Sequence, residues 1–324
     1  MTWRALPMTS PTDSALVQFA ADVRYYLSLT PRQLPSEYLY DALGSALFDA
    51  ICRLPWYGIT RAESRLLAAH RADIFRRIGG LSTIIELGPG NGDKLRLLLN
   101  AAERPGGLNV HLVDVSQHAL DLAARTVAGF GHVGVVRHCA TYDDGLREAM
   151  AQASGRSLIA FLGSNIGNFD PPGAAAFLSN VRSSMSRHDA LLLGVDLVKP
   201  EQALLLAYDD PIGVTAAFNR NLLARINREL GADFDLDQFR HQAVWNGDES
   251  RVEMHLVACC TQHVHVEYAE LDVRLEPGER IWTESSYKYS ADEVTALLRS
   301  CGFAAAAQWI DEADRFALTL AEAV

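Results

Sequence analysis

The sequence predicts an α/β protein built on an open, doubly wound parallel sheet, and two observations carry this prediction. Short apolar runs, typical of buried strands, alternate with helical segments through the middle of the chain. A glycine-rich segment, residues 86–92, directly follows the first run, at the edge where such sheets bind ligands. The expected strands are residues 83–87, 110–115, 133–136, 158–162 and 190–195.

Helical segments are expected around these strands, at residues 15–27, 40–53, 60–78, 93–102, 117–130, 143–153 and 173–185. Two helix starts carry a capping-box pattern, in which a hydroxyl at the N-cap precedes a carboxylate at the third helical position. Thr60 stands before Glu63 in this way, and Ser290 stands before Glu293. The second of these helices should end at about residue 301.

The strict alternation stops after residue 196. A helix is expected at residues 214–230, followed by strands at 251–258, 264–268 and 280–286. Two last strands, at residues 306–310 and 316–321, are expected to rejoin the sheet. Residues 197–286 are therefore expected to be an insertion before the last elements of the sheet.

Composition excludes several classes of protein. The chain has 324 residues, of which 49% are hydrophobic and 21% charged, so a disordered or collagen-like chain is excluded. Its net charge of −11 argues against a nucleic-acid or anionic-membrane partner. The five cysteines form no C-x-x-C pair, which favours a reduced cytoplasm. The N-terminal residues lack an apolar core long enough for a signal peptide, and the sequence has no uninterrupted apolar run of ~18 residues, so neither a signal peptide nor a membrane span is expected.

The glycine-rich segment distinguishes between cofactors. A dinucleotide fingerprint would need glycine at Asp93, and a P-loop would need Ser or Thr at Leu95, after Lys94. The pattern E-x-G-x-G-x-G that begins at Glu86 resembles the cofactor loop of S-adenosylmethionine (SAM) methyltransferases. Asp114 ends the second expected strand, where a carboxylate can accept hydrogen bonds from both ribose hydroxyls. The expected co-substrate is SAM, and no metal is expected, since His263 and His265 lack partners at ligand spacing.

Longer segments resemble one family over about residue 20 to the end. They are residues 38–41, 44–45, 47–49, 53–55, 161–168, 197–199, 207–210, 213–221 and 283–286. Together they closely resemble the L-histidine Nα-methyltransferases of ergothioneine biosynthesis. The resemblance implies a Rossmann-like class I methyltransferase sheet, formed by residues 61–196 and 287–324. It also implies a second, α+β substrate domain, formed by residues 1–60 and 197–286.

The same resemblance implies an activity and its surroundings. The enzyme would transfer three methyl groups from SAM to the α-amino group of L-histidine, giving the betaine hercynine. We expect a small-molecule amino-acid substrate, no nucleic-acid or membrane partner, and a cytoplasmic monomer.

Site residues follow from the resemblance by position. The expected cofactor contacts are Gly88, Gly90, Lys94, Asp114, Thr141 and Tyr142. The expected substrate contacts are Tyr57, Asn168, Tyr208, Met254, Glu284, Ser285 and Ser286. The expected catalytic residues, which would orient the amine, are Tyr40, Asn168 and Tyr208. The chain departs from the family pattern at Gly58-Ile59 and at Thr141-Tyr142, where the adenine contact is expected.

The chemistry of histidine agrees with these assignments. Glu284 and Ser286 are two residues apart, so on a strand both would point to one face. A neutral imidazole offers one donor and one acceptor, which a carboxylate and a hydroxyl can engage together. Such a site could discriminate by roughly 10⁴ against a side chain that leaves its polar groups unpaired. Methyl transfer itself needs in-line alignment and a deprotonated amine, and positioning alone can contribute ~7–11 kcal/mol.

Two other readings remain open. The chain could methylate another amino acid such as tryptophan, although an indole would leave Glu284 or Ser286 without a partner. It could instead be a non-catalytic relative that binds histidine or hercynine, against which the intact Gly88, Asp114 and Asn168 weigh. A nicotinamide oxidoreductase is disfavoured by Asp93.

Overall fold

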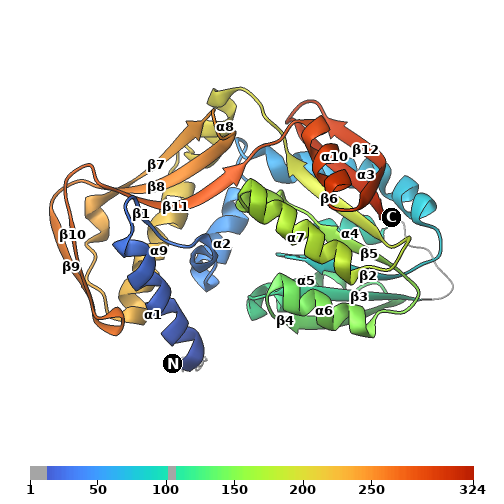
Figure 1. Cartoon of the computed structure of the whole chain (residues 1–324), viewed down its shortest axis with the longest axis horizontal. Coiled ribbons are helices and arrows are strands. Elements are labelled where there is room, and N and C mark those ends of the chain that lie inside the picture. Colours follow the sequence, from blue (N-terminus) through green and yellow to red (C-terminus); the bar gives the residue numbers. More distant parts are fainter. Residues whose placement is uncertain (1–12, 101–106) are drawn as a thin grey trace, which may run out of the picture.

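A computed structural model describes residues 13–100 and 107–324 of the chain. The last residues of the helix expected at 93–102 lie outside these ranges. Figure 1 shows a large sheet covered by helices on the right and a smaller, strongly curved sheet with its own helices on the left. The N-terminal helix lies against the smaller sheet, and the C-terminus ends in the large one.

The large sheet has seven strands in the order β12-β13-β6-β5-β2-β3-β4. Strands β2 to β6 pair in parallel, and β13 lies antiparallel between β6 and β12. This is the Rossmann-like strand order of class I methyltransferases, and it confirms the expected α/β fold. The strands are β2 (Leu81–Leu87), β3 (Leu108–Asp114), β4 (Val133–Cys139), β5 (Arg156–Phe161), β6 (Ala190–Asp196), β12 (Phe303–Asp311) and β13 (Phe316–Ala323).

Helices cover both faces of this sheet, which is why its central strands are buried along most of their length. Ile84 and Leu112 face one layer, while their neighbours Ile85 and Val113 face the other, as the period of two requires. The first layer is formed by α3 (Gly58–Ile78), α4 (Asp93–Leu99) and α5 (Gln117–Val127). The second is formed by α6 (Tyr142–Gln152), α7 (Pro171–Ser184) and α10 (Ala291–Ser300).

The smaller sheet has the order β1-β11-β8-β7. It joins the N-terminal segment to the insertion, because β1 (Arg32–Gln33) pairs in parallel with β11 (Arg280–Tyr287). A separate hairpin of β9 (Gln262–Val266) and β10 (Leu271–Leu275) lies at its end. The remaining elements here are α1 (Asp13–Ser28), α2 (Ala42–Ile51), α8 (Glu201–Tyr208), α9 (Val214–Leu230), β7 (Phe239–Asn246) and β8 (Arg251–Ala258).

Three elements of the insertion were missed by the sequence analysis. Strand β7 contains Arg240, His241 and Gln242 and is only half-buried, so it lacks the apolar run of a typical strand. Strand β10 has only five residues, and α8 is an eight-residue helix whose N-cap, Pro200, makes no side-chain capping bond. The expected helix at 214–230 and the expected strand at 251–258 agree with α9 and β8.

One of the two predicted capping boxes is wrong. Ser290 and Glu293 form theirs, with both reciprocal hydrogen bonds present. Helix α3 instead begins at Gly58, two residues before Thr60, and its N-cap Tyr57 makes no side-chain capping bond. Glu63 is fully buried and reaches another partner, the backbone amide of Gly163, which explains why it does not cap the helix.

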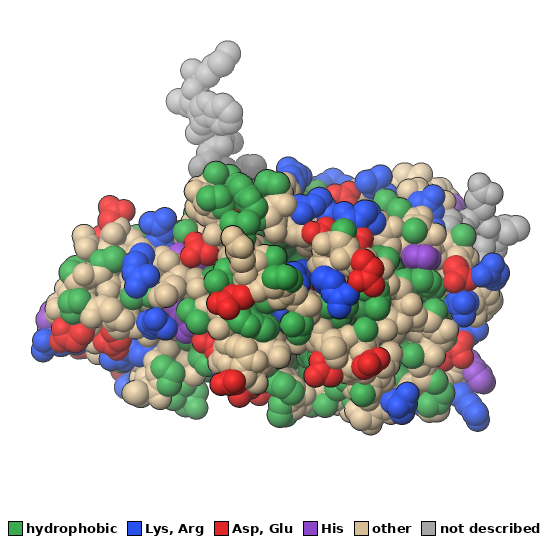
Figure 2. All heavy atoms as spheres, turned by 90° about the horizontal axis from the view of Figure 1, so that it is seen from above, with side chains coloured by type: hydrophobic (Ala, Val, Ile, Leu, Met, Phe, Trp, Pro, Cys, Tyr) green, Lys and Arg blue, Asp and Glu red, His purple; other side chains and the backbone are tan. Residues whose placement is uncertain are grey.

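The surface carries both signs of charge. Figure 2 shows acidic and basic side chains interspersed over the face seen from above. No helix within residues 13–100 and 107–324 is long and apolar enough to cross a membrane.

Candidate active site

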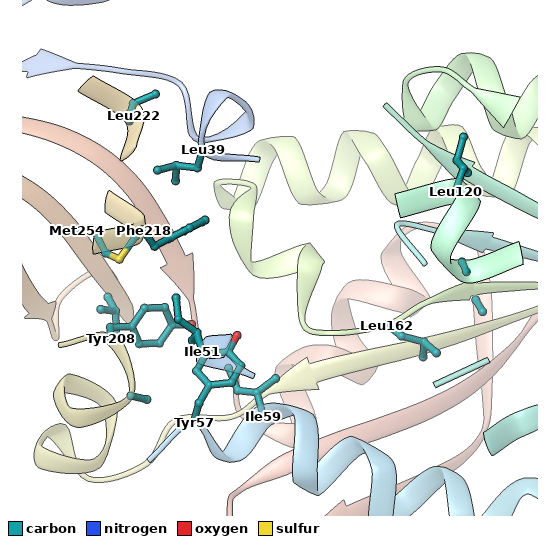
Figure 3. Packing of buried hydrophobic residues seen from close by; sticks show 14 of the residues in the cluster. Leu39, Ile51, Tyr57, Ile59, Leu120, Leu162, Tyr208, Phe218, Leu222 and Met254 are labelled. Carbon is teal, nitrogen blue, oxygen red and sulfur yellow. The ribbon is translucent and has the colours of Figure 1, made fainter. Parts of the chain in front are cut away.

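A pocket lies where the two sheets meet. It is lined from the smaller sheet and its helices on one side and from the loop after β5 on the other. Figure 3 shows five of the apolar and aromatic lining residues near one another: Ile51, Tyr57, Tyr208, Phe218 and Met254. The lining residues are Tyr40, Phe48, Ile51, Tyr57, Gly163, Ser164, Asn165, Asn168, Ala207, Tyr208, Thr215, Phe218, Met254, Glu284 and Ser286. Seven of the residues expected from the sequence are therefore brought together here: Tyr40, Tyr57, Asn168, Tyr208, Met254, Glu284 and Ser286.

Strand β11 supplies the polar end of the pocket. Glu284 and Ser286 alternate along this strand and point to the same side, and Met254 of β8 lies opposite Glu284 in the ladder. Burial raises the pKa of the Glu284 carboxyl to about 7, while the positive charge of Lys288 acts in the opposite direction. This end of the pocket therefore offers a carboxylate and a hydroxyl within an otherwise apolar wall.

Aromatic rings form that wall. Tyr40 packs edge-on against Phe48 and Phe218, with ring centroids 5.5 and 5.4 Å apart. The ring centroids of Tyr57 and Tyr208 are 6.3 Å apart, and both side chains are buried except where they face the pocket. Burial raises the pKa of the Tyr40 and Tyr57 phenols well above their ordinary value, so both hydroxyls stay protonated at neutral pH.

The loop after β5 brings amide groups to the other side of the pocket. Ser164 adopts a left-handed conformation (φ 61°), and the 3₁₀ turn η2 (Asn165–Asn168) follows it. Three contacts hold the loop: Glu63 accepts from the Gly163 amide at 2.8 Å, Ser164 Oγ accepts from the Asp196 amide at 2.9 Å, and Gly167 packs on the Tyr287 backbone. Asn165 and Asn168 both face the pocket as a result.

The glycine-rich loop lies beside this turn. Gly88, Gly90 and Gly92 all have positive φ values, 73°, 54° and 79°, which other residues rarely adopt. A Cβ placed on Gly88 would lie 2.9 Å from both Asn165 Nδ2 and Tyr142 Oη. The loop thus borders the pocket through Asn165, while a Cβ placed on Gly90 would meet open space.

Asp114 ends β3 beside the same loop. Its carboxylate accepts from the Ser116 amide at 2.8 Å, and burial raises its pKa. Thr141 caps α6 by accepting from the Asp144 amide, so its hydroxyl is engaged at the helix start. A left-handed glycine loop with room beside Gly90 and a carboxylate at the next strand end fits a nucleoside such as that of SAM.

Lys94 is bound within the protein. Its ammonium lies 2.8 Å from Glu63 Oε2, and this carboxylate raises the pKa of Lys94 against the opposite effect of burial. Nearby, burial raises the pKa of Glu86 to about 8, and its buried Oε2 has no hydrogen-bond partner among the described residues.

Sequence reasoning also placed residues here that the pocket does not include, and it missed others. Ser285 points to the other face of β11 and does not line the pocket. Glu63 was missed because it was assigned to a helix cap. Lys288 was missed although its position, two residues after Ser286, continues the alternation of Glu284 and Ser286.

Within the described part of the chain, no group of three or more His, Cys, Asp or Glu residues could hold a metal ion.

Comparison with known proteins agrees with this geometry. The sequence profile of a family described as "Histidine-specific methyltransferase, SAM-dependent" matches residues 19–323. A histidine N-alpha-methyltransferase from Mycolicibacterium smegmatis is 43% identical over 311 residues, covering 95% of this chain and 96% of the relative. The corresponding protein from Mycobacterium tuberculosis is 42% identical over the same shares of both chains.

A more distant relative is an L-tryptophan methyltransferase from Psilocybe serbica. It is 29% identical over 323 residues, covering 89% of this chain and 87% of the relative. The profile match over nearly the whole chain and the identity to both mycobacterial enzymes leave one assignment: the chain belongs to the family of SAM-dependent, histidine-specific methyltransferases.

Proposed function

We infer that this protein is an enzyme that methylates the α-amino group of L-histidine with SAM, in ergothioneine biosynthesis. The similarity to histidine N-alpha-methyltransferases over 95% of the chain supports this function. The observation that carries it is the shared pocket: Glu284 and Ser286 face the same space as Asn168 and Tyr208, and Asn165 joins that space to Gly88. We propose three successive transfers, which give hercynine.

The imidazole of the substrate would lie against β11. Glu284 would accept a hydrogen bond from the N–H of the ring and Ser286 would bond the other ring nitrogen, while Met254 and Phe218 would pack against the ring. The amino-acid end then extends toward η2, where Asn168 offers an amide. In this orientation the α-amino nitrogen lies at the side of the pocket that borders the glycine loop.

The cofactor would lie along the glycine loop, held by the residues expected from the sequence. Gly88 and Gly90 allow its close approach, Asp114 accepts from the ribose, and Tyr142 lies beside Gly88. SAM supplies a methyl group on a sulfonium, which needs no metal for its transfer. The protein contributes alignment, worth ~7–11 kcal/mol when two reactants are held in line.

The tyrosines act as fixed hydrogen-bonding groups in this proposal. Because burial raises the pKa of the Tyr40 phenol, a phenolate base at this position is disfavoured. Tyr40 and Tyr208 would orient the neutral amine, and its proton would leave through water before each transfer. Positioning of the amine, rather than covalent or acid–base chemistry, then accounts for the rate.

The direct test is incubation of the purified protein with SAM and a panel of amino acids, followed by mass spectrometry. Histidine should gain one, two and finally three methyl groups, with trimethylated product accumulating. Methylated tryptophan in place of methylated histidine would assign the chain to another substrate. Binding of histidine without any methylated product would assign it to the non-catalytic alternative.

We also propose the domain division expected from the sequence, 61–196 with 287–324 and 1–60 with 197–286, and a cytoplasmic monomer. The meeting of both parts at the pocket supports a two-domain enzyme. Light scattering on the purified protein measures the oligomeric state.

A further inference from the structure

A buried lysine lies directly behind the polar wall of the pocket. Lys288 is 2% exposed and does not line the pocket itself. Its Nζ lies 2.8 Å from Tyr208 Oη, 2.9 Å from Ser286 Oγ and 3.0 Å from Asp196 Oδ2. An ammonium has three protons and no acceptor, so these three oxygens use its whole capacity.

The contacts of Lys288 determine the direction of the neighbouring hydrogen bonds. Because the ammonium can only donate, both Tyr208 Oη and Ser286 Oγ accept from it. Tyr208 in turn donates to Ser286 at 2.8 Å. Ser286 Oγ thereby accepts from two donors, which fills both of its lone pairs. The only group that Ser286 has left for the pocket is its own proton.

We propose that Lys288 is a positioning residue that makes Ser286 a hydrogen-bond donor toward the substrate, beside the acceptor Glu284. This inference rests on the proposed function, because the pair then matches a neutral imidazole, which has one N–H and one unprotonated nitrogen. A serine without Lys288 could rotate and either accept or donate. The ammonium therefore makes the pocket complementary to a single arrangement of protons on the bound imidazole, with the N–H toward Glu284 and the unprotonated nitrogen toward Ser286.

The charge of Lys288 supports the acceptor as well. Glu284 faces Lys288, Tyr40 and Tyr57, of which Lys288 carries the positive charge. The ammonium lowers the pKa of Glu284 against the effect of burial and so keeps this group an acceptor to lower pH. One cation thus acts on both members of the pair that would hold the imidazole.

A purely structural role must be distinguished from this one, because Asp196 also lies at the junction of the two parts. Lys199 provides the matched control. It donates to the other oxygen of the same carboxylate, Asp196 Oδ1, at 2.6 Å, and to the Asp314 carbonyl at 2.6 Å. Lys199 is half-buried, with 11% of its side chain exposed, and it neither lines the pocket nor contacts Tyr208 or Ser286 in any recorded hydrogen bond. Both lysines stabilise the fold through Asp196, and Lys288 alone reaches the substrate wall.

The experiment compares Lys288→Met with Lys199→Met in the full chain. Histidine affinity is measured by calorimetry in the presence of S-adenosylhomocysteine, together with kcat, KM and the melting temperature. In Lys288→Met we expect the histidine Kd and KM to rise about tenfold or more. Without the ammonium, Ser286 is no longer held as a donor, and its hydrogen bond to the substrate is weakened or lost. Affinity for S-adenosylhomocysteine should change less than about twofold. In Lys199→Met, histidine affinity should match the wild type.

The pH dependence of histidine binding distinguishes the two roles, because a purely structural role of Lys288 would leave it unchanged. Histidine binding is measured from about pH 6 to about pH 9 in each protein, where the titration of histidine itself is the same. Without the Lys288 charge, the acidic limit of binding that belongs to Glu284 should move to higher pH. In Lys199→Met this limit should stay where it is in the wild type.

The outcomes separate the two hypotheses. Equal histidine affinities and equal pH profiles in Lys288→Met and Lys199→Met would overturn the role of Lys288, while methylation of histidine by the wild type would leave the proposed function intact. A wild type that does not bind histidine overturns both. If Lys288→Met does not fold, the double variant Asp196→Asn/Lys288→Met removes the buried carboxylate left without its partner, and the same comparison is made with Asp196→Asn/Lys199→Met.

Discussion

We expect the buried, ionised carboxyl of Glu284 to lower the free energy of unfolding of the protein. The substitution Glu284→Gln tests this. Burial raises the pKa of its carboxyl from the usual 4.5 to about 7. Above pH ~7, where the carboxyl is ionised in the folded protein, that difference corresponds to a loss of ~3 kcal/mol in the free energy of unfolding. Glutamine has the same shape and carries no charge, so it avoids this cost.

The sign depends on pH. Below about pH 4.5 the carboxyl is protonated in both the folded and the unfolded protein, so the substitution should change little. As the pH rises through about 7, the stability that the neutral carboxyl contributed is lost from the wild type only. At pH ~8 we expect Glu284→Gln to raise the free energy of unfolding by up to ~3 kcal/mol, or the melting temperature by ~4 °C.

Glu253 on the neighbouring strand β8 provides a control of opposite sign. Burial raises its pKa, but hydrogen bonds from Asn246 and Arg251 outweigh burial and lower it. Glu253→Gln should therefore lower the free energy of unfolding at pH ~8.

Thermal melts of the three proteins at about pH 5 and about pH 8, with calorimetry of histidine binding, measure both effects. If Glu284→Gln lowers the melting temperature at pH ~8 as Glu253→Gln does, burial of this carboxylate is not a cost, and our reasoning about the site is refuted. Histidine binding to Glu284→Gln should weaken despite the gain in stability.

Three further predictions concern the cofactor loop, the amine and the stability of the sheet. Gly88→Ala, at φ 73° and with its Cβ 2.9 Å from Tyr142 Oη, should weaken S-adenosylhomocysteine binding about tenfold or more in calorimetry; unchanged affinity would place the cofactor elsewhere. Tyr40→Phe should lower kcat more than it raises the histidine Kd, and an unchanged kcat would show that its hydroxyl does not orient the amine. Burial and the neighbouring His138 lower the pKa of His111, so the unfolded chain takes up a proton first and stability should fall below about pH 6.5. Urea unfolding should show a smaller loss in His111→Gln, and an equal loss in both proteins would contradict this.

The positions of the parallel strands along the chain and of the glycine-rich loop after β2 follow from local pattern. The alternation of apolar runs with helices predicted the parallel part of the large sheet, because buried strands and amphipathic helices have distinct periods. The insertion was harder to predict. Strand β7 is half-buried and rich in polar residues, and only pairing with β8 determines that it is a strand.

The candidate site shows the same division. Glu284 and Ser286 share a face because alternation along a strand is a local property, which the spacing in the sequence already contains. Where that face points is decided by the packing of β11 between β1 and β8 and against the turn η2. The partners of buried charges were not predictable. Glu63 looked like a helix cap, yet it bonds the Gly163 amide a hundred residues away, and Lys288 meets Asp196 only when β6 and β11 come together.

The sequence by itself determined the fold class, the glycine-rich loop after the first strand of the large sheet, and the placement of Glu284 and Ser286 on one face of a strand, since these follow from periodicity and from motifs of adjacent residues. Only the tertiary structure decided which side chains share a pocket and which charges neutralise one another. A buried charge must find its partner wherever the fold brings one within reach, because an unpaired charge in the interior is too costly to keep.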